Sequence, residues 1–321
     1  MDSYSSLYST LDDLAGNIAF LSGGAIYGNR VNTINLNGSI IQNNSALNGG
    51  GLAVSWNAYI YVNECLFSHN RGGYEGGAIN LIDTVIDIQN SKFLSNKALS
   101  GGGIFLSHSN STITNSNFSI NAAESGGALY LFGSSAVNIT DAYFTSNFAF
   151  LGGAMFGDNS NIFLKSSYFS KNSASGAYAD VSSRIAELEI DYVLSSIYGL
   201  GGAFYVYLTR VVYTGCHFTE NVADIGGVFY LEYANVESPY SKKGMLSSFI
   251  RNSATFEGGG FAVVNPSLVD LFMNVFQSNQ AATLGRAIYA INFGTITLRN
   301  CSVEKEDKTS VIICNTKHLL L

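Results

Sequence analysis

The chain has 321 residues, and its 16 Lys and Arg against 23 Asp and Glu give a formal net charge of −7 at pH 7. Only 12% of the residues are charged and 47% are hydrophobic, which excludes an intrinsically disordered chain. The acidic balance lacks the positive surface that a nucleic-acid binder needs, and no stretch approaches the ~18 uninterrupted apolar residues of a transmembrane span.

The chain opens with residues 1–13, which we interpret as a partial N-terminal coil or tail without the features of a secretory signal peptide. After them, a pentad of two glycines, a small residue, an apolar residue and a frequently aromatic residue recurs. Its copies begin at positions 23, 49, 76, 101, 126, 152, 175, 201, 226, 258 and 285. The copy at 175 (SGAYA) is degenerate, and the longest step, from 226 to 258, is 32 residues.

A second motif interleaves with the pentad at the same period. It is an apolar residue, usually Phe, followed three positions later by Asn. Asparagine tolerates a left-handed backbone and can hydrogen-bond to its counterpart on a neighbouring coil. We therefore predict a structural ladder of stacked asparagines. Its predicted members are Asn43, Asn70, Asn96, Asn121, Asn147, Asn172, Asn221, Asn252 and Asn279.

The residues around these motifs alternate in the manner of β-strands. The fourth pentad position is apolar in every copy, and the position two residues later is mostly apolar. A second strand precedes each Phe, and the Phe segment can form a third. Three short strands and three turns in about 25 residues describe one coil of a parallel β-helix, with neighbouring coils about 4.8 Å apart. We predict an all-β, right-handed parallel β-helix of about eleven coils, each of about 25–26 residues.

The predicted β-helix is a single domain over residues 14–303. Within it we expect a degenerate coil at about 173–200, around the degenerate pentad at 175. We also expect a loop insertion at about 237–244, within the longest step between pentads. Residues 304–321 are expected to form a C-terminal tail or cap, which would shield the open strand edges of the last coil.

Three of the four cysteines, Cys65, Cys216 and Cys301, occupy one column two residues before the Phe position. They lie several coils apart, whereas a disulfide needs Cα atoms within about 7 Å. We interpret them as small thiols in a column of small residues. Of the four, only Cys314, in the tail, is expected to lie within reach of Cys301. We expect no metal site and no cofactor.

The Gly-Gly-Ala pentad together with the Phe-x-x-Asn motif resembles the repeat of the polymorphic outer-membrane proteins, which are autotransporter-type surface adhesins with a β-helical passenger. The resemblance covers residues 14–303. It implies a fold of the pectin-lyase-like right-handed β-helix superfamily. It also implies an exported, non-catalytic, adhesive or coat-like rod in an extracellular or cell-surface location. Because this sequence contains neither a signal peptide nor a C-terminal membrane barrel, a segment of a larger polypeptide is expected.

Among the sequences that match the N-glycosylation pattern Asn-x-Ser/Thr are those that begin at Asn37, Asn43, Asn110, Asn117 and Asn138. They would be used only if the chain passes through a eukaryotic secretory route. A chain rich in Asn and Ser also produces such matches by chance.

Many β-helices are polysaccharide lyases or glycosidases, and glycoside hydrolysis needs two carboxylates that converge on one bond. The best candidates are Glu187, Glu189 and Asp191, which alternate with apolar residues in the degenerate coil. Lys165 on the preceding coil and Arg210 on the following one would flank them. We interpret this group as a solvated, ion-paired strand face. The alternative is a carbohydrate- or cation-binding site that could be catalytic.

Two further features are candidates for binding a ligand or partner. Aligned aromatic rings can stack on sugar rings or contact a protein, although they can equally stack on one another. The aromatic residues of the outer pentad column are Tyr27, Phe105, Tyr130, Phe156, Tyr205, Tyr230 and Tyr289. The inserted loop carries Tyr240, Lys242 and Lys243, and loops that interrupt a repeat often carry function, although a tolerated insertion would look the same.

We therefore expect a non-catalytic, surface-exposed or secreted rod that binds protein or glycan partners on its outer face. A carbohydrate-active β-helix with a site near Glu187 and Glu189 is one alternative. A repeat segment of a larger membrane or surface protein is another. Converging carboxylates in the folded chain would favour the enzyme.

Overall fold

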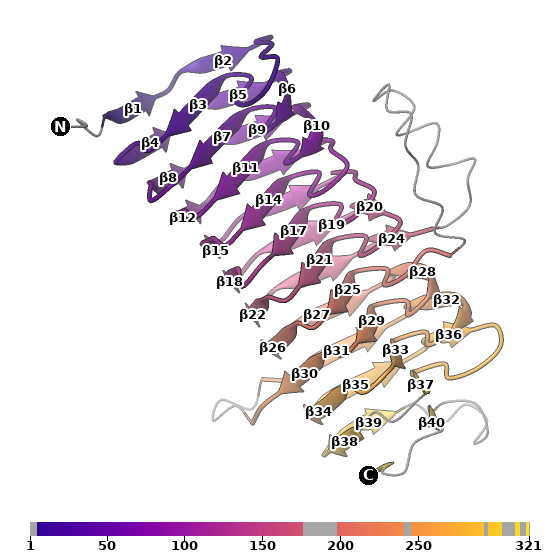
Figure 1. Cartoon of the computed structure of the whole chain (residues 1–321). Coiled ribbons are helices and arrows are strands. Elements are labelled where there is room, and N and C mark those ends of the chain that lie inside the picture. Colours follow the sequence, from indigo (N-terminus) through magenta and orange to yellow (C-terminus); the bar gives the residue numbers. More distant parts are fainter. Residues whose placement is uncertain are drawn as a thin grey trace.

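The computed structural model describes residues 5–175, 198–240, 245–291 and 295–303, and the backbone of 312–314 and 319–320. Across these segments the chain forms short β-strands, β1 to β41, and no helix. The strands stack in parallel as successive coils, which run from the indigo N-terminal end to the yellow C-terminal end in Figure 1. This confirms the prediction of an all-β parallel β-helix.

Three long parallel sheets form the faces of the stack, and each coil contributes one strand to each sheet. We call them sheets 1, 2 and 3 in the order in which one coil visits them after the pentad glycines. Sheet 1 contains β3 (Ile26–Asn29), β7 (Leu52–Ser55), β11 (Ile79–Ile82), β14 (Ile104–Ser107), β17 (Leu129–Phe132), β21 (Met155–Asp158), β25 (Phe204–Tyr207), β29 (Phe229–Glu232), β33 (Phe261–Val264), β37 (Ile288–Ala290) and β40 (Ile312–Cys314). Its eleven strands agree with the predicted number of coils.

Sheet 2 holds the strands that follow sheet 1 within each coil, with one further strand, β1, at the N-terminal end of the stack. Its strands are β1 (Ser6–Thr10), β4 (Thr33–Asn37), β8 (Tyr59–Asn63), β12 (Val85–Gln89), β15 (Asn110–Thr114), β18 (Ala136–Thr140), β22 (Asn161–Lys165), β26 (Arg210–Thr214), β30 (Asn235–Ser238), β34 (Leu268–Phe272), β38 (Thr295–Arg299) and β41 (Leu319–Leu320).

Sheet 3 holds the strands that carry the Phe position. They are β2 (Asp13–Ala15), β5 (Ile40–Gln42), β9 (Leu66–Ser68), β13 (Lys92–Leu94), β16 (Asn117–Ser119), β19 (Tyr143–Thr145), β23 (Tyr168–Ser170), β27 (His217–Thr219), β31 (Ser247–Ile250), β35 (Asn274–Gln277) and β39 (Ser302–Val303). At the corner that leads back to sheet 1, some coils add a short strand. These are β6 (Ser45–Asn48), β10 (Arg71–Glu75), β20 (Phe148–Ala149), β24 (Ser173–Ala174), β28 (Val222–Ile225), β32 (Ser253–Glu257) and β36 (Gln280–Ala281).

The core is a column of apolar side chains enclosed by the three sheets. In the coil that begins at Gly76, the inward residues are Ile79 and Leu81 from sheet 1, Ile86 and Ile88 from sheet 2, and Phe93 from sheet 3. Each is at most 1% exposed. The phenylalanines of sheet 3 stack along the axis, with neighbouring ring centroids 4.6–5.4 Å apart. The period-two alternation of the sequence therefore follows from burial of one side of each strand.

Asparagines form a ladder at the turn after sheet 3, and all its members except the first, Asn17, are buried. The Oδ1 of Asn121 accepts hydrogen bonds from the backbone N–H and the Nδ2 of Asn96, both at 3.0 Å. The Nδ2 of Asn121 donates to the carbonyl oxygen of Phe93 at 2.9 Å and to the Oδ1 of Asn147 at 3.0 Å. The same pattern repeats along the stack. The members of the ladder are Asn17, Asn44, Asn70, Asn96, Asn121, Asn147, Asn172, Asn221, Asn252 and Asn279.

One predicted member of this ladder is wrong. Asn43 was assigned to it, but Asn44 occupies that position, is 1% exposed and bonds to the Oδ1 of Asn70. Asn43 instead adopts a left-handed turn conformation with φ of 54°. The register explains the shift, because Ile41 rather than Ile40 pairs with Phe67 in the inward column.

The pentad glycines allow neighbouring coils to approach closely. Gly126 has φ of +65°, a conformation that side chains disfavour. A Cβ on Gly127 would lie 2.2 Å from the carbonyl oxygen of Gly153 on the next coil. The first glycine therefore makes the turn, and the second leaves room for the neighbouring backbone.

A degenerate coil is predicted at 173–200, but the strands of the coils on either side of it pair directly with one another. β21, β22 and β23 pair directly with β25, β26 and β27, so no coil separates them. Ser173 and Ala174 form β24 at the corner, and Gly199 lies against Ala174. The residues between, 176–197, are outside the described part of the chain. The spacing of the pentad copy at 175 therefore predicts a coil at a place where β21 and β25 pair directly.

The eleventh strand of sheet 1 comes instead from the segment predicted to be a tail or cap. β40 pairs with β37, and β41 pairs with β38. At the opposite end, β1 and β2 pair with β4 and β5, so residues 6–15 form a partial coil. The stack therefore extends beyond residues 14–303 in both directions.

Candidate functional site

The carboxylate group predicted from the sequence is not assembled within the described residues. Glu187, Glu189 and Asp191 lie outside them. The two predicted flanking cations both lie on sheet 2, but at opposite ends of their strands. Arg210 pairs in register with Asn161, whereas Lys165 pairs with Thr214. The structure therefore does not bring Lys165 and Arg210 together.

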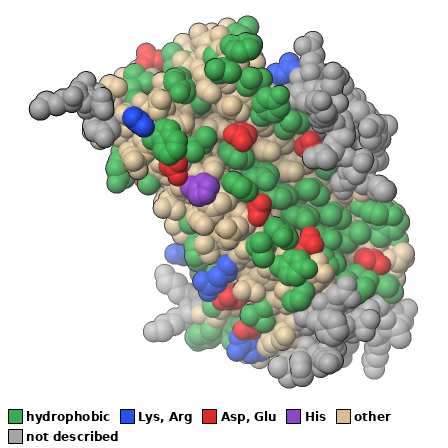
Figure 2. Space-filling model, viewed as in Figure 1, with side chains coloured by type: hydrophobic (Ala, Val, Ile, Leu, Met, Phe, Trp, Pro, Cys, Tyr) green, Lys and Arg blue, Asp and Glu red, His purple; other side chains and the backbone are tan. Residues whose placement is uncertain are grey.

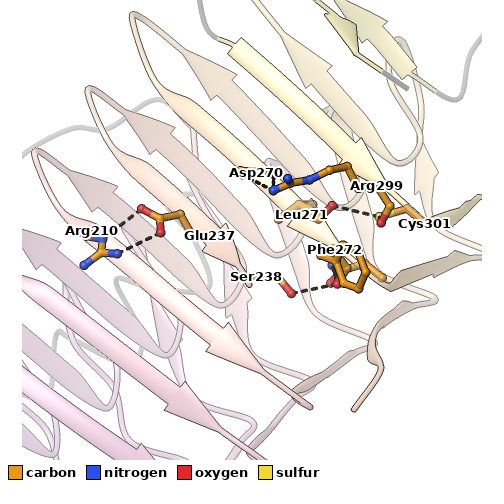
Figure 3. A network of polar contacts seen from close by, with 9 residues as sticks. Arg210, Glu237, Ser238, Asp270, Leu271, Phe272, Arg299 and Cys301 are labelled. Carbon is orange, nitrogen blue, oxygen red and sulfur yellow. Dashed lines mark hydrogen bonds and ion pairs between the residues drawn. The ribbon is translucent and has the colours of Figure 1, made fainter. Parts of the chain in front are cut away.

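Arg210 forms a two-pronged contact with a different acid, Glu237. Both residues point outward from sheet 2, from β26 and β30 (Figure 3). The Nε of Arg210 donates to Oε1 of Glu237 at 3.0 Å, and its Nη2 donates to Oε2 at 2.9 Å. This planar fork fixes both side chains in one geometry. The hydrogen bond from Arg210 lowers the pKa of Glu237 from its ordinary value, although partial burial opposes the shift.

A second acid, Asp270, lies beside Glu237. The two residues pair in register on β30 and β34, and neighbouring strands of a sheet lie about 4.8 Å apart. Asp270 is bound from the other side by Arg299, whose Nη2 donates to Oδ1 at 2.6 Å. The face therefore carries the order Arg, Glu, Asp, Arg along the axis (Figure 3). All four side chains are 31–56% exposed.

Shallow polar depressions lie along the same face. One of about 210 Å³ is lined by Asn159, Asn161, Arg210, Tyr233 and Asn235, among others, and so adjoins the Arg210–Glu237 pair. Two others, of about 320 and 310 Å³, lie nearer the N-terminal end of sheet 2. Their lining includes Asn57, Tyr59, Asp83, His108 and Asn110 in one, and Asn35, Asn37, Tyr61, Asp87 and Gln89 in the other. Amide, carboxylate, imidazole and tyrosine groups of this kind hydrogen-bond to hydroxyl-rich ligands.

The inserted loop begins beside this group. Tyr240 is 67% exposed and packs edge-on against Phe272, with ring centroids 5.2 Å apart. Phe272 follows Asp270 on β34, and its carbonyl oxygen accepts a hydrogen bond from Ser238. Lys242 and Lys243 are outside the described residues. Of the predicted loop candidates, Tyr240 therefore lies near the four charged residues.

Most aromatic rings of the predicted outer column pack against one another. Phe105, Tyr130, Phe156, Tyr205 and Tyr230 stack on one another, with centroids 4.6–5.2 Å apart. Phe105 and Phe156 are only 6% and 9% exposed, so these two cannot offer an open ring face to a ligand.

The two remaining members of that column are separate from the stack. Tyr27 is 59% exposed, and Tyr289 is only partly exposed. Ala53 and Asn80 interrupt the column between Tyr27 and Phe105, and Ala262 interrupts it before Tyr289. Their separation follows from these small or polar residues, because a stack needs a ring on each successive coil.

The acidic side chains are otherwise dispersed. Figure 2 shows them as separate spots among neutral and apolar side chains on the face that it presents. Within the described ranges, no three His, Cys, Asp or Glu side chains come together in a way that could hold a metal ion. Cys65, Cys216 and Cys301 are free thiols, and burial raises the pKa of each. No helix of that same part of the chain is long and apolar enough to cross a membrane.

Sequence reasoning missed Glu237, Asp270 and Arg299, although a signal for them was present. Val236 and Val269 are both inward residues and pair in register, so the acids that directly follow them must share one outward position. The 32-residue step between the pentads at 226 and 258 obscured this relation. Aligning the coils by their inward residues, rather than by pentad spacing, places the acids side by side.

A comparison with protein families matches residues 77–238 to the right-handed β-helix region. No curated protein and no solved structure matches the chain significantly. The matched residues make up about half of the chain and cover coils from β11 to β30. The chain therefore belongs to the right-handed β-helix family, which confirms the predicted handedness.

Proposed function

We propose that this β-helix is a non-catalytic binding rod, surface-exposed or secreted, that holds a glycan or protein partner against the outer face of sheet 2. The observation that carries the proposal is the Arg210–Glu237 and Asp270–Arg299 arrangement, which presents fixed hydrogen-bonding groups beside a polar depression. Recognition of this kind needs side chains that are held in place before the ligand arrives. The repeat resemblance to polymorphic outer-membrane adhesins supports the surface location and the adhesive role.

A carbohydrate-active enzyme is the second candidate, and one observation favours it. Glu237 and Asp270 are neighbours in one outward column, and glycosidases use a pair of carboxyl groups on one face. However, a general acid needs a raised pKa, whereas Arg210 lowers the pKa of Glu237. Asp270 is also bound to a guanidinium. The electrostatics therefore favour binding over acid–base catalysis.

The test is a glycan-array and polysaccharide-depolymerisation screen of the wild type and of a Glu237→Gln/Asp270→Asn variant. A Glu220→Gln variant is the matched control, because Glu220 forms a similar exposed pair with Arg251 at 2.7 Å outside sheet 2. We expect the wild type to bind a glycan without cleaving it. The affinity should fall about tenfold or more in the double variant, which corresponds to about 1.4 kcal/mol or more of binding free energy, and should be unchanged in the control. Cleavage that disappears in the double variant would establish the enzyme instead. Equal binding by all three proteins would refute the proposed face.

A further inference from the structure

Asn117 begins one of the Asn-x-Ser/Thr sequences, and its setting differs from that of the others. It lies on β16 of sheet 3, and its side chain is exposed. Phe118, the middle residue, is fully buried in the core. Because alternate residues of a strand face opposite ways, Asn117 and Ser119 both face solvent. The acceptor amide and the hydroxyl of the sequence are therefore both on the outer surface.

The next coil places an aromatic ring directly beside Asn117. Tyr143 pairs with Asn117 in register, on the neighbouring strand β19. Tyr143 is 47% exposed although one of its ring faces is covered by Tyr168, with centroids 5.0 Å apart and planes 6° from parallel. His217 continues the stack at 4.9 Å. Since Tyr168 lies on the side away from β16, the open face of the Tyr143 ring is turned toward Asn117.

The other sequences of this pattern lack such an exposed ring. The register neighbours of Asn37 and Asn110 on the following coil are Asn63 and Ala136. Asn43 and Asn300, which begin two others, lie in turns with φ of 54° and 51°. Asn138 pairs with Phe163, but that ring is half-buried in sheet 2.

We propose that Asn117 is an N-glycosylation site whose first N-acetylglucosamine packs against the open face of Tyr143. The inference rests on the proposed secreted or surface location, because the co-reactant is a lipid-linked oligosaccharide diphosphate of the secretory route. In the transfer, the Nδ2 of Asn117 forms a bond to C1 of the sugar and loses one proton. The bond from C1 to the diphosphate oxygen breaks, and the lipid diphosphate leaves. The C–H face of the sugar then covers apolar ring surface that is otherwise exposed to water.

The test is secretion of the full chain, with an added leader, from a eukaryotic host, followed by trimming of each glycan to one N-acetylglucosamine. Peptide mass spectrometry measures occupancy at Asn117 and at Asn110, the matched site on the same coil. Melting temperatures and N-acetyl methyl chemical shifts are then compared among the wild type, Asn117→Gln and Tyr143→Ser. We expect an occupied Asn117, a melting temperature about 1–2 °C above that of Asn117→Gln, and an upfield-shifted methyl signal that Tyr143→Ser abolishes.

An empty Asn117 in secreted protein whose Asn110 is occupied would overturn the proposal. An occupied Asn117 whose methyl shift is unchanged by Tyr143→Ser would overturn the packing on the ring. The test of glycosylation at Asn117 can be distinguished from the test of the binding face on sheet 2. Asn117 lies on sheet 3, so Asn117→Gln should leave glycan-array binding intact. Loss of binding in the Glu237→Gln/Asp270→Asn variant is likewise independent of occupancy at Asn117.

Discussion

Replacing Asn121 with Ala tests whether the buried asparagine ladder stabilises the coils. The substitution removes four hydrogen bonds, two donated by Asn96 and one each accepted by Phe93 and Asn147. It leaves the backbone N–H of Asn96 without its acceptor in a place that water does not reach, since Asn96 and Asn121 are both 0% exposed. At about 1 kcal/mol for each net bond, we expect a loss of about 3–4 kcal/mol in the free energy of unfolding.

Urea unfolding followed by far-UV circular dichroism measures this change, with hydrogen exchange on peptides of the same coil as a second readout. Exchange is useful because the coils of a solenoid can unfold separately. Asn117→Ala is the matched control, since Asn117 is an exposed asparagine of the same coil. We expect the control to change stability by no more than about 0.5 kcal/mol. Equal unfolding midpoints for Asn121→Ala and Asn117→Ala would refute a stabilising ladder.

Three further predictions follow from the same contacts. Gly127→Ala should prevent folding, because its Cβ would lie 2.2 Å from the carbonyl oxygen of Gly153, and circular dichroism measures this. Gly28→Ala is the control: its Cβ would meet only side chains at 3.1 Å or more, so it should keep the wild-type spectrum. Phe144→Ala should lower the free energy of unfolding by about 3–5 kcal/mol, because its fully buried ring stacks between two others at 4.8 Å; a loss below about 1 kcal/mol would contradict this. Since Arg210 lowers the pKa of Glu237 from 4.5, this pair stabilises the folded state above that value and loses its effect as the pH falls through the lower folded-state pKa. In urea unfolding, the wild type should therefore be more stable than Glu237→Gln by less than about 1 kcal/mol at pH 7, and the two should be equally stable at low pH. A stability difference that persists at low pH would argue against a stabilising pair.

The inward half of the structure could be predicted from the sequence because burial imposes one residue type on each column. Ile86 and Ile88 were expected to face the core, since the same two positions are apolar on most coils, with Ser111 and Ser238 among the exceptions. The choice between Asn43 and Asn44 was harder, because the sequence offers two adjacent Ile and two adjacent Asn residues. Only the register decides it: Ile41 is 0% exposed and Ile40 is 36% exposed.

The outward half could not be predicted in the same way, because solvent tolerates most residue types. Aligned aromatic residues were visible in the sequence, but their packing was not. Whether Phe156 offers its ring to a ligand or to Tyr130 and Tyr205 depends on the distance between coils and on side-chain direction. The degenerate pentad at 175 is a related case: its spacing fits the repeat, yet β21 pairs directly with β25 and no coil lies between them.

The best guide to function is an outward residue that differs from the usual stacking of like, neutral side chains on successive coils. Stacked neighbours in this fold are mostly alike and neutral, as in the Asn and Phe columns, and such neighbours attract one another. Glu237 and Asp270 are alike but charged, so their stacking opposes folding unless something neutralises it. Arg210 and Arg299 do so from the two outer sides, at the cost of ordering long side chains. An arrangement that folding alone does not require is where a binding surface is expected, and this is why we place it on sheet 2 rather than on the aromatic stack.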